Sequence, residues 1–421
     1  MLHPPAVFIG LRPVWAATLK RKTEVPLQIM KQLFPILLII LALTGYSQAQ
    51  TDVLSAAQKL IDAKKYESAY LLLNNDDPNN EKPDVVLMKE DIVLNYFVSS
   101  MMHQAFALKD LKKNEDIMKY RGQTGTFNMF PFQVDSVLLK LIEAYPDNCK
   151  LYRGLAFYYN EVLNKYGVWL GDEEELGQNI IDNSKKSIDG GCADYATYHN
   201  MGLVLLMQEK TEQSIPYLEK ATELAPDQAD AHYNLAYAYL FTDQFDNALP
   251  HAKLALKLYK DKELKGDAAR ITGGILAEKR DYLNALKYYE MADKLIPNDF
   301  YNLSPLLRLY LVTGNQKAPS TAKKLFELAP ENPSIYQAMT EAYQFAGREP
   351  ELVRFYKSML PKYVNNDVVF GNLHFYLGTL SLEHDKAAAK QYFLKAKEIF
   401  RHVFSDDHYV FGVIDAALEG L

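Results

Sequence analysis

A repeat of 34 residues constrains the fold of this chain more than any other feature of its sequence. Residues 195–228 align without a gap with residues 229–262. Both segments place large residues at positions 4, 7 and 11 and small residues at positions 8, 20 and 27. The matching residues are Tyr198, Met201, Gly202, Leu205, Ser214 and Ala221 in the first segment, and His232, Leu235, Ala236, Tyr239, Ala248 and Ala255 in the second. Repetition at such a period indicates a stack of similar structural units.

The spacing within each unit predicts two α-helices. Positions 4, 7, 8 and 11 fall on one stripe of a helix, and positions 20, 24 and 27 fall on one stripe of a second helix. Small residues allow the two helices to approach closely, and a proline such as Pro226 ends the unit because it cannot continue a helix. One pair of helices cannot bury its apolar stripe alone, so neighbouring pairs must stack to form a core.

This pattern resembles the tetratricopeptide repeat, whose units carry large, large, small, large, small, large, small and proline residues at these positions. Looser copies follow at residues 266–299, 300–332, 333–366 and 371–404. The resemblance implies an all-α, right-handed α-solenoid of tetratricopeptide-like helix-turn-helix repeats, with roughly ten helical pairs and no sheet.

We expect the solenoid to occupy residues 191–421, with a last helix that caps the stack in residues 407–421. Residues 50–190 carry the pattern in divergent form. Within them the stretch 121–132 (RGQTGTFNMFPF) is irregular: its Gly and Pro favour turns, whereas its three Phe require burial. We interpret it as an ordered insert packed on the solenoid. Helices are expected around it at residues 84–111 (one long helix or two), 133–145 and 173–187.

Residues 30–49 match a secretory signal peptide. The run 33–43 is apolar and uncharged, follows a lysine and precedes small residues that end at Ala49. In a helix this run spans about 16 Å, well short of a hydrocarbon core of ~30 Å, which favours cleavage before Gln50 over a spanning helix. We therefore expect an exported protein, periplasmic or associated with the cell envelope. Residues 1–29, which contain four prolines, are expected to be an unstructured extension upstream of the signal.

Composition narrows the possible ligands. The chain is 48% hydrophobic and 24% charged, values typical of folded globular proteins rather than disordered or multi-span membrane proteins. The formal charge of the whole chain is −7. The first 49 residues contain five basic residues and one acidic residue and so carry +4, which leaves −11 on the remainder. An acidic body without a long basic run argues against nucleic acid as a partner.

No familiar catalytic or cofactor-binding motif occurs in the sequence. GxSxG, HExxH, GxxxxGK[ST] and GxGxxG are all missing, so no catalytic residue, metal or cofactor is expected. Two short clusters combine carboxylates with imidazole, Glu383-His384-Asp385 and Asp406-Asp407-His408. Both begin expected helices, where acidic residues serve as caps and suit the helix dipole, so we interpret them as caps rather than metal sites.

The two cysteines leave an alternative open. Cys149 begins an expected first helix, and Cys192 lies just before the first helix of the next repeat. An exported protein can carry a disulfide, which needs Cα atoms within about 7 Å. Neighbouring helix axes lie about 8–10 Å apart, which favours two separate, half-buried thiols.

A second stripe on each first helix, at positions 5, 9 and 12 with 2, 6 and 13 beside it, is left free of the core. The resemblance implies that this stripe lines a concave groove that binds extended peptides or partner helices. Aromatic rings and Arg are common interface anchors, and Asn can pair with a ligand backbone. The candidate partner-binding residues are Asn200, Tyr233, Asn234, Tyr237, Phe241 and Arg270. Tyr and Asn are also ordinary choices in this repeat, so a purely structural role remains an alternative for them.

The resemblance also argues against one known mode of recognition. Family members that hold a free C-terminal carboxylate place Lys and Asn at positions 5 and 9 of their first unit. This chain has His199 and Leu203 there, so we do not expect carboxylate binding.

The sequence predicts a non-enzymatic scaffold of the bacterial cell envelope that binds protein partners in the groove of the solenoid. One alternative is an exported helical protein that binds a glycan or a peptide. The outer-membrane glycan-binding proteins that resemble this repeat fold carry a lipoprotein cysteine and large inserts, and neither is evident here. A further alternative is an enzyme whose site lies in the divergent N-terminal third.

Overall fold

The computed structural model describes residues 52–122, 127–166 and 171–421. The expected extension 1–29 and signal peptide 30–49 lie outside the described residues. The chain divides into two compact units, with the boundary between Phe132 and Gln133.

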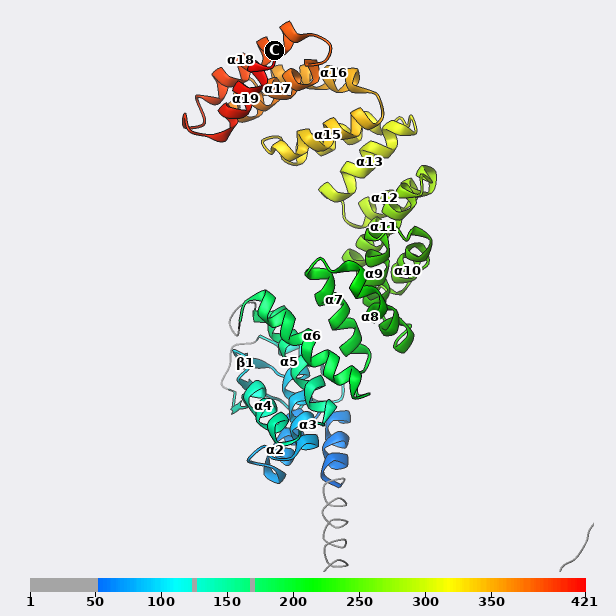
Figure 1. Ribbon diagram of the computed structural model, residues 1–421, viewed down its shortest axis with the longest axis vertical. Helices are drawn as coiled ribbons and strands as arrows, with labels where there is room; N and C mark the ends of the chain where they lie inside the picture. The colour runs from blue at the N-terminus through cyan, green and yellow to red at the C-terminus, as the bar shows by residue number, and fades with distance from the viewer. Residues whose placement is uncertain (1–51, 123–126, 167–170) are drawn as a thin grey trace, which may run out of the picture. The chain divides into compact units, whose positions relative to one another are not determined.

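The second unit is a succession of helix pairs (Figure 1). We call the N-terminal member of each pair the first helix and the other the second helix. The first helices are α5 (Cys149–Tyr166), α7 (Tyr195–Met207), α9 (Ala229–Phe241), α11 (Lys262–Glu278), α13 (Phe300–Val312), α15 (Pro333–Phe345) and α17 (Asp367–Ser381). The second helices are α6 (Glu173–Asp189), α8 (Thr211–Leu224), α10 (Phe245–Leu258), α12 (Tyr282–Leu295), α14 (Ala318–Leu328), α16 (Glu349–Met359) and α18 (Lys386–Phe400). The α4 helix (Val134–Ala144) precedes these pairs, the 3-10 turn η3 (Leu360–Lys362) follows α16, and α19 (Tyr409–Glu419) comes last.

Short polar side chains fix where several of these helices begin. Asp194 forms a capping box with Thr197, in which its carboxylate accepts from the Thr197 amide at 3.0 Å. Asp385 accepts from the Ala388 amide at 2.9 Å, and His408 accepts from the Val410 amide at 3.3 Å. The expected capping role of the acidic residues is therefore confirmed for Asp385, whereas in the second cluster the cap is His408 and not one of the two aspartates.

The core positions predicted from the repeat are buried. Ala248, Ala252 and Ala255 on α10 are fully buried, so α10 packs closely against its neighbours. Glycines on first helices permit the same approach elsewhere: a Cβ on Gly202 would lie 2.6 Å from Leu218 Cγ, and one on Gly273 would lie 2.8 Å from Tyr289 Cδ2. The all-α, repeat-based packing of this unit is confirmed.

Gly273 and Gly274 form a natural matched pair on α11. Gly273→Ala should lower the free energy of unfolding by about 1–3 kcal/mol, because the added methyl overpacks against the buried Tyr289 ring. Gly274→Ala should leave it unchanged or raise it by up to about 1 kcal/mol, because its Cβ would lie 3.4 Å from the Tyr289 hydroxyl and Ala favours helix. Urea unfolding of both variants measures the difference, and equal effects would contradict this packing.

Two kinds of polar contact recur between successive repeats. A side chain early in a first helix donates to the carbonyl six residues before it: Tyr152 to Pro146 (3.0 Å), His232 to Pro226 (3.1 Å), Asn302 to Ile296 (3.0 Å) and Tyr336 to Pro330 (2.7 Å). A tyrosine late in a first helix donates to a glutamate twenty residues earlier on the preceding second helix, as Tyr310 does to Glu290 at 2.6 Å and Tyr239 does to Glu219. These contacts fix the junction between neighbouring pairs.

The first unit departs from the expected fold. It contains a helix at 52–62, α2 (Tyr66–Asp76), α3 (Pro83–Asn95), the 3-10 turn η1 (Ile117–Lys119) and an antiparallel sheet with strand order β1 (Ser99–Met101), β2 (Ala105–Ala107) and β3 (Met129–Pro131). The expectation of no sheet is wrong. So is the helical reading of residues 84–111, of which only the first part is helical.

The physical reason is a tight turn between β1 and β2. The loop has three residues, in which Met102 and His103 adopt left-handed backbone conformations, with φ of 50° and 53°, and the Gln104 amide donates to the Met101 carbonyl at 3.0 Å. The irregular insert contributes β3, and its Phe130 and Phe132 pack on Tyr70 with ring centroids 5.2 and 6.3 Å away. Within the first unit Phe132 is buried and Phe130 is half-buried.

Cys149 and Cys192 form a disulfide, with Cα atoms 5.7 Å apart. The separate thiols favoured by helix spacing are wrong, because Cys192 lies in the turn after α6 rather than on a helix axis. Gly190 permits the approach, since a side chain there would collide with Cys149. Arg153 of α5 adds a polar link to the same turn through the Cys192 carbonyl and Asp194, both at 3.5 Å.

Candidate binding surface on the first helices

The predicted binding residues lie on three first helices that follow one another in the stack. Asn200 is on α7, Tyr233, Asn234, Tyr237 and Phe241 are on α9, and Arg270 is on α11. Tyr237 and Phe241 are exposed, whereas Asn200, Tyr233, Asn234 and Arg270 are half-buried.

Asn234 links α9 to α7 through His199. Its side-chain amide lies 3.0 Å from His199 Nε2, and the His199 ring stacks on Tyr195 with centroids 5.4 Å apart. Burial lowers the pKa of His199, against a smaller opposing effect of its hydrogen bond with Asn200. The neutral imidazole can therefore accept the Asn234 proton, and both asparagines help to position His199.

Tyr233 and Arg270 are tied into the structure beside them. The Tyr233 ring packs edge-on against Tyr259 with centroids 6.2 Å apart, and burial raises the Tyr233 pKa. Arg270 pairs with Asp267 and, at 3.5 Å, with Asp299, while its guanidinium lies over the Tyr301 ring at 5.6 Å. The two carboxylates neutralise Arg270, so it orders the surface more than it offers a free positive charge.

Tyr237 and Phe241 form the apolar part of the predicted site. One helical turn separates them, and their rings lie 4.3 Å apart between centroids. Phe241 is 62% exposed. Together they present a rigid aromatic surface at the C-terminal half of α9.

Sequence reasoning missed two exposed aromatic residues farther along the stack, Tyr301 on α13 and Phe345 on α15. They are 65% and 57% exposed, and the Arg308 guanidinium lies over the Phe345 ring at 5.2 Å. Tyr301 and Phe345 occupy positions 2 and 13 of their repeats, the edges of the stripe already considered, so the same periodicity could have found them. We call Tyr237, Phe241, Arg270, Tyr301, Arg308 and Phe345 the first-helix face.

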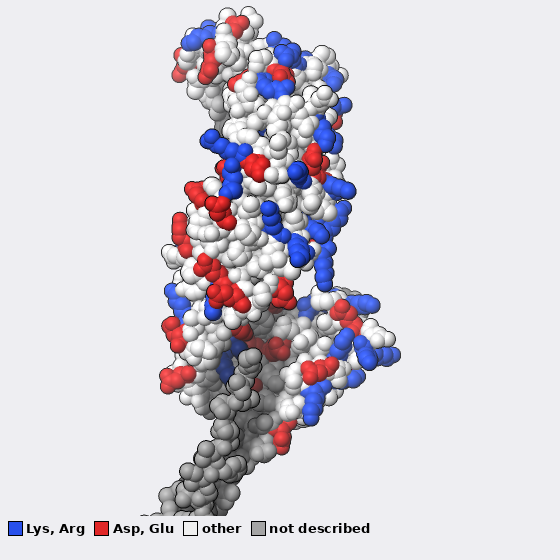
Figure 2. All heavy atoms as spheres, turned by 90° about the vertical axis from the view of Figure 1, so that its right-hand side faces the viewer, with Lys and Arg blue, Asp and Glu red and all other residues white. Residues whose placement is uncertain are grey.

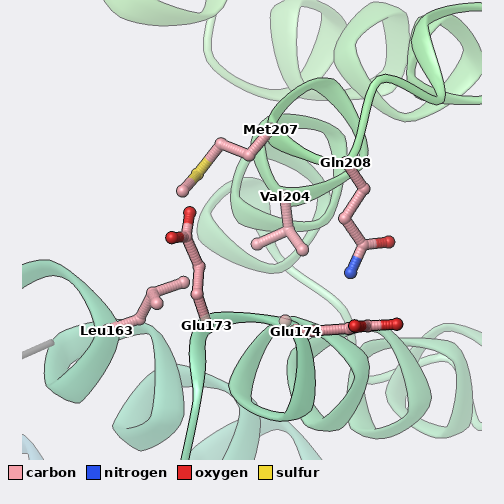
Figure 3. Close-up of a pocket in the computed structure, with 7 residues that line it drawn as sticks. Leu163, Glu173, Glu174, Val204, Met207 and Gln208 are labelled. Atoms are coloured by element: carbon pink, nitrogen blue, oxygen red, sulfur yellow. The ribbon is translucent and has the colours of Figure 1, made fainter. Parts of the chain in front are cut away.

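Among the hollows of the described residues, two are lined by neighbouring first helices. One of about 270 Å³ lies between α13 and α15 and is lined by Ser304, Pro305, Arg308, Ala338, Glu341, Ala342 and Phe345. The other, of about 330 Å³, lies between α5, α6 and α7 and is lined by Leu163, Glu173, Glu174, Gly177, Val204, Met207 and Gln208 (Figure 3). In this second hollow Glu173 points toward Met207, so an acidic group meets an apolar wall.

Comparison with known proteins addresses the family. A model described as tetratricopeptide repeat matches residues 194–261, which span α7 to α10. Residues 194–261 are therefore tetratricopeptide repeats. No curated protein sequence matches it significantly.

Several solved structures are similar to the chain. A tetratricopeptide repeat protein from Parabacteroides merdae is 16% identical with a TM-score of 0.41, over 64% of this chain and 97% of its own. MamA protein is 17% identical with a TM-score of 0.38, over 44% and 94%. Pseudomonas aeruginosa pilF is 19% identical with a TM-score of 0.38, over 50% and 87%. These likenesses say nothing about partner or activity.

The sequence left an enzyme site in the divergent N-terminal third as an alternative, and Lys89 is a fully buried charged residue in that part of the chain. This ammonium donates to the Asp77 carbonyl at 2.5 Å and to the Asn80 and Asn74 side chains at 2.8 and 3.2 Å. Burial lowers the Lys89 pKa, opposed by Asp77. Since its three donors are all used and the side chain is fully buried, Lys89 holds the turn after α2 rather than a substrate.

The described residues contain no group of three or more His, Cys, Asp or Glu placed to hold a metal ion. Within those same ranges, no helix is both long and apolar enough to cross a membrane. On the face drawn in Figure 2, acidic and basic side chains are interspersed rather than gathered into a continuous basic surface.

The contact between His232 on α9 and His251 on α10 predicts that stability depends on pH. His232 Nε2 lies 3.1 Å from the Pro226 carbonyl oxygen and therefore donates to it, and His232 Nδ1 lies 2.8 Å from His251 Nδ1, so one of these two nitrogens donates a proton to the other. Burial and then His232 lower the pKa of His251 below its ordinary value of 6.5. As the pH falls below 6.5, His251 binds a proton in the unfolded chain but not yet in the folded chain. The free energy of unfolding therefore falls until the pH reaches the pKa of His251 in the folded chain.

His251→Gln should reduce this dependence, because Gln can still donate to His232 but does not titrate. Urea midpoints of the variant and the unmodified chain at pH 7.5 and pH 5.5 provide the comparison. Identical losses on acidification in both proteins would show that His251 is not responsible.

Proposed function

We propose that the chain is a scaffold that binds a segment of a partner protein on its first-helix face. The observation that carries this proposal is the row of exposed aromatic residues on α9, α13 and α15, each held by neighbouring groups. Aromatic and Arg side chains dominate the binding energy of protein interfaces. Because stacking and cation–π contacts already restrict Phe241, Tyr301 and Phe345, binding costs little side-chain entropy.

A partner segment that crosses several repeats fits this arrangement better than a small ligand. Exposed anchors on α9, α13 and α15 belong to different helix pairs, and the hollow beside Phe345 offers room for one side chain. Arg308 and Glu341 at that hollow supply both charge signs, which would orient polar groups of the segment.

A photo-crosslinking experiment tests the proposal. A photoreactive amino acid at Phe241 should form a crosslink to one discrete partner in an envelope extract. The same residue at Leu283, an exposed apolar position on the second helix α12, is the control. Equal crosslinking from both positions, or none from Phe241 while Leu283 captures a partner, would move the site off the first-helix face.

We also propose that the protein acts in the cell envelope of a bacterium, after export. The apolar run 33–43 with its flanking lysine and small residues supports this, and so does the disulfide, which persists in oxidising compartments. Mass spectrometry of the mature protein should find an N-terminus at or near Gln50. A protein that retains residues 30–49 would contradict the cleaved signal and favour a membrane anchor.

A further inference from the structure

The last helix, α19, has one packed face and one open face. Phe411 and Ile414 are buried against α18, and Leu418 packs on the same apolar cluster. Lys397 of α18 pairs with Asp415. This packed face corresponds to the side by which every first helix rests on the preceding second helix, so α19 occupies the place of a first helix.

The open face of α19 is unusually apolar for a helix face that no other described residue covers. It consists of Tyr409, Gly412, Val413 and Ala416, which are all exposed; Tyr409 is 71% and Val413 is 47% exposed. A helix that is apolar on both sides is normally buried. This face therefore has the character of an interior surface.

Glycines elsewhere in the chain show what such a face accommodates. Gly202, Gly273 and Gly378 each directly follow a packed residue of a first helix, as Gly412 follows Phe411. Each of those three is covered by a large side chain of its own second helix, Leu218, Tyr289 or Phe393, within 2.9 Å of where a Cβ would stand. At Gly412 no atom of the described residues lies within 4 Å of that point. The space that a second helix fills in other repeats is open here.

Charge indicates what kind of helix can fill it. Residues 405–421 contain four acidic residues and no Lys or Arg; Lys397 pairs with Asp415, which leaves Asp406, Asp407 and Glu419. A second copy of α19 would bring like charges together, whereas a helix rich in Lys or Arg would be attracted.

We propose that the open face of α19 docks an amphipathic helix of a partner protein, which places a large apolar side chain over Gly412 and basic residues along its edges. The docked helix acts as the second helix that completes this repeat. The surface is separate from the first-helix face, so either proposal can fail without the other.

The chain itself supplies a suitable probe. A synthetic peptide with the sequence of residues 386–400 has four Lys and one Glu, and its Phe393 covers Gly378 in the native repeat. Titration into the full-length protein should give saturable binding. A peptide with Phe393→Ala, and one with its four Lys replaced by Glu, should each bind about tenfold more weakly or worse, a loss of about 1.4 kcal/mol.

Gly412→Leu is the decisive variant of the protein. It should weaken peptide binding by about tenfold or more because Leu occupies the open space, yet it should not lower stability, since Leu favours helix and meets no neighbour. Ala387→Leu, at an exposed position of α18, is the matched control and should bind normally. Tyr237→Ala combined with Phe241→Ala should also bind normally.

Unchanged binding by Gly412→Leu, or no binding to the unmodified protein, would overturn the proposal. Sedimentation distinguishes the rival occupant: a dimer of the unmodified chain that Gly412→Leu dissociates would make a second copy the occupant and the basic partner helix wrong.

Discussion

Removal of the Cys149–Cys192 disulfide is expected to lower the free energy of unfolding of the α5–α7 region by about 2–4 kcal/mol. The bond joins residues separated by 43 positions, and closing a loop of that size removes about 4 kcal/mol of chain entropy from the unfolded state. Because stability in a repeat array is largely local, the loss should concentrate on α5, α6 and the start of α7. The Arg153 contacts to the Cys192 carbonyl and Asp194 remain but are long and half-exposed, so they offset little of it.

Hydrogen exchange of the Cys149→Ser/Cys192→Ser variant measures this effect region by region. Amides of α5 and α6 should lose protection, whereas those of α13 to α18 should keep it. Reductant should bring the unmodified protein to the same state and leave the variant unchanged, which is the internal control. Two free thiols in the protein isolated without reductant would contradict the disulfide.

The repeated part of the fold is readable from sequence because its rules are local. Spacing of large and small residues defines each helix pair, and Gly202 and Ala248 stand where helices must touch, so burial follows directly. The β1–β2 hairpin was not predicted because its turn contains Met102 and His103 rather than Asn-Gly, the usual sequence signal of a left-handed turn. The disulfide escaped because it depends on the path of a turn rather than on helix spacing.

The candidate site was only partly readable for a different reason. Helical periodicity indicates which side chains point away from the core. It does not indicate which of these side chains are already bound to residues of neighbouring helices. Asn234 contacts His199 and Arg270 contacts two aspartates, contacts that join separate helices and have no sequence signal. Tyr237 and Phe241, one turn apart on the same helix, were within reach of periodicity alone.

Loss of Tyr237 and Phe241 together is expected to weaken partner binding by about 30-fold or more. Central aromatic anchors typically contribute about 2 kcal/mol or more, and about 1.4 kcal/mol corresponds to tenfold in affinity. Both side chains are exposed and lie outside the buried cluster to which α9 contributes, so Tyr237→Ala/Phe241→Ala should fold with nearly unchanged stability. Binding and folding effects therefore separate in this variant.

Leu283→Ala/Leu394→Ala provides the matched control. Leu283 on α12 and Leu394 on α18 are also exposed and apolar, but they belong to second helices. This double variant removes a similar apolar surface and should bind the partner normally.

The most direct test uses the partner that photo-crosslinking identifies, in purified form. Calorimetric titration measures its affinity for the unmodified chain and for each of the two double variants. The account predicts that the unmodified chain and Leu283→Ala/Leu394→Ala bind alike, whereas Tyr237→Ala/Phe241→Ala binds about 30-fold more weakly or not at all. Full affinity in Tyr237→Ala/Phe241→Ala, with its fold intact, would contradict the assignment of the first-helix face as the binding surface.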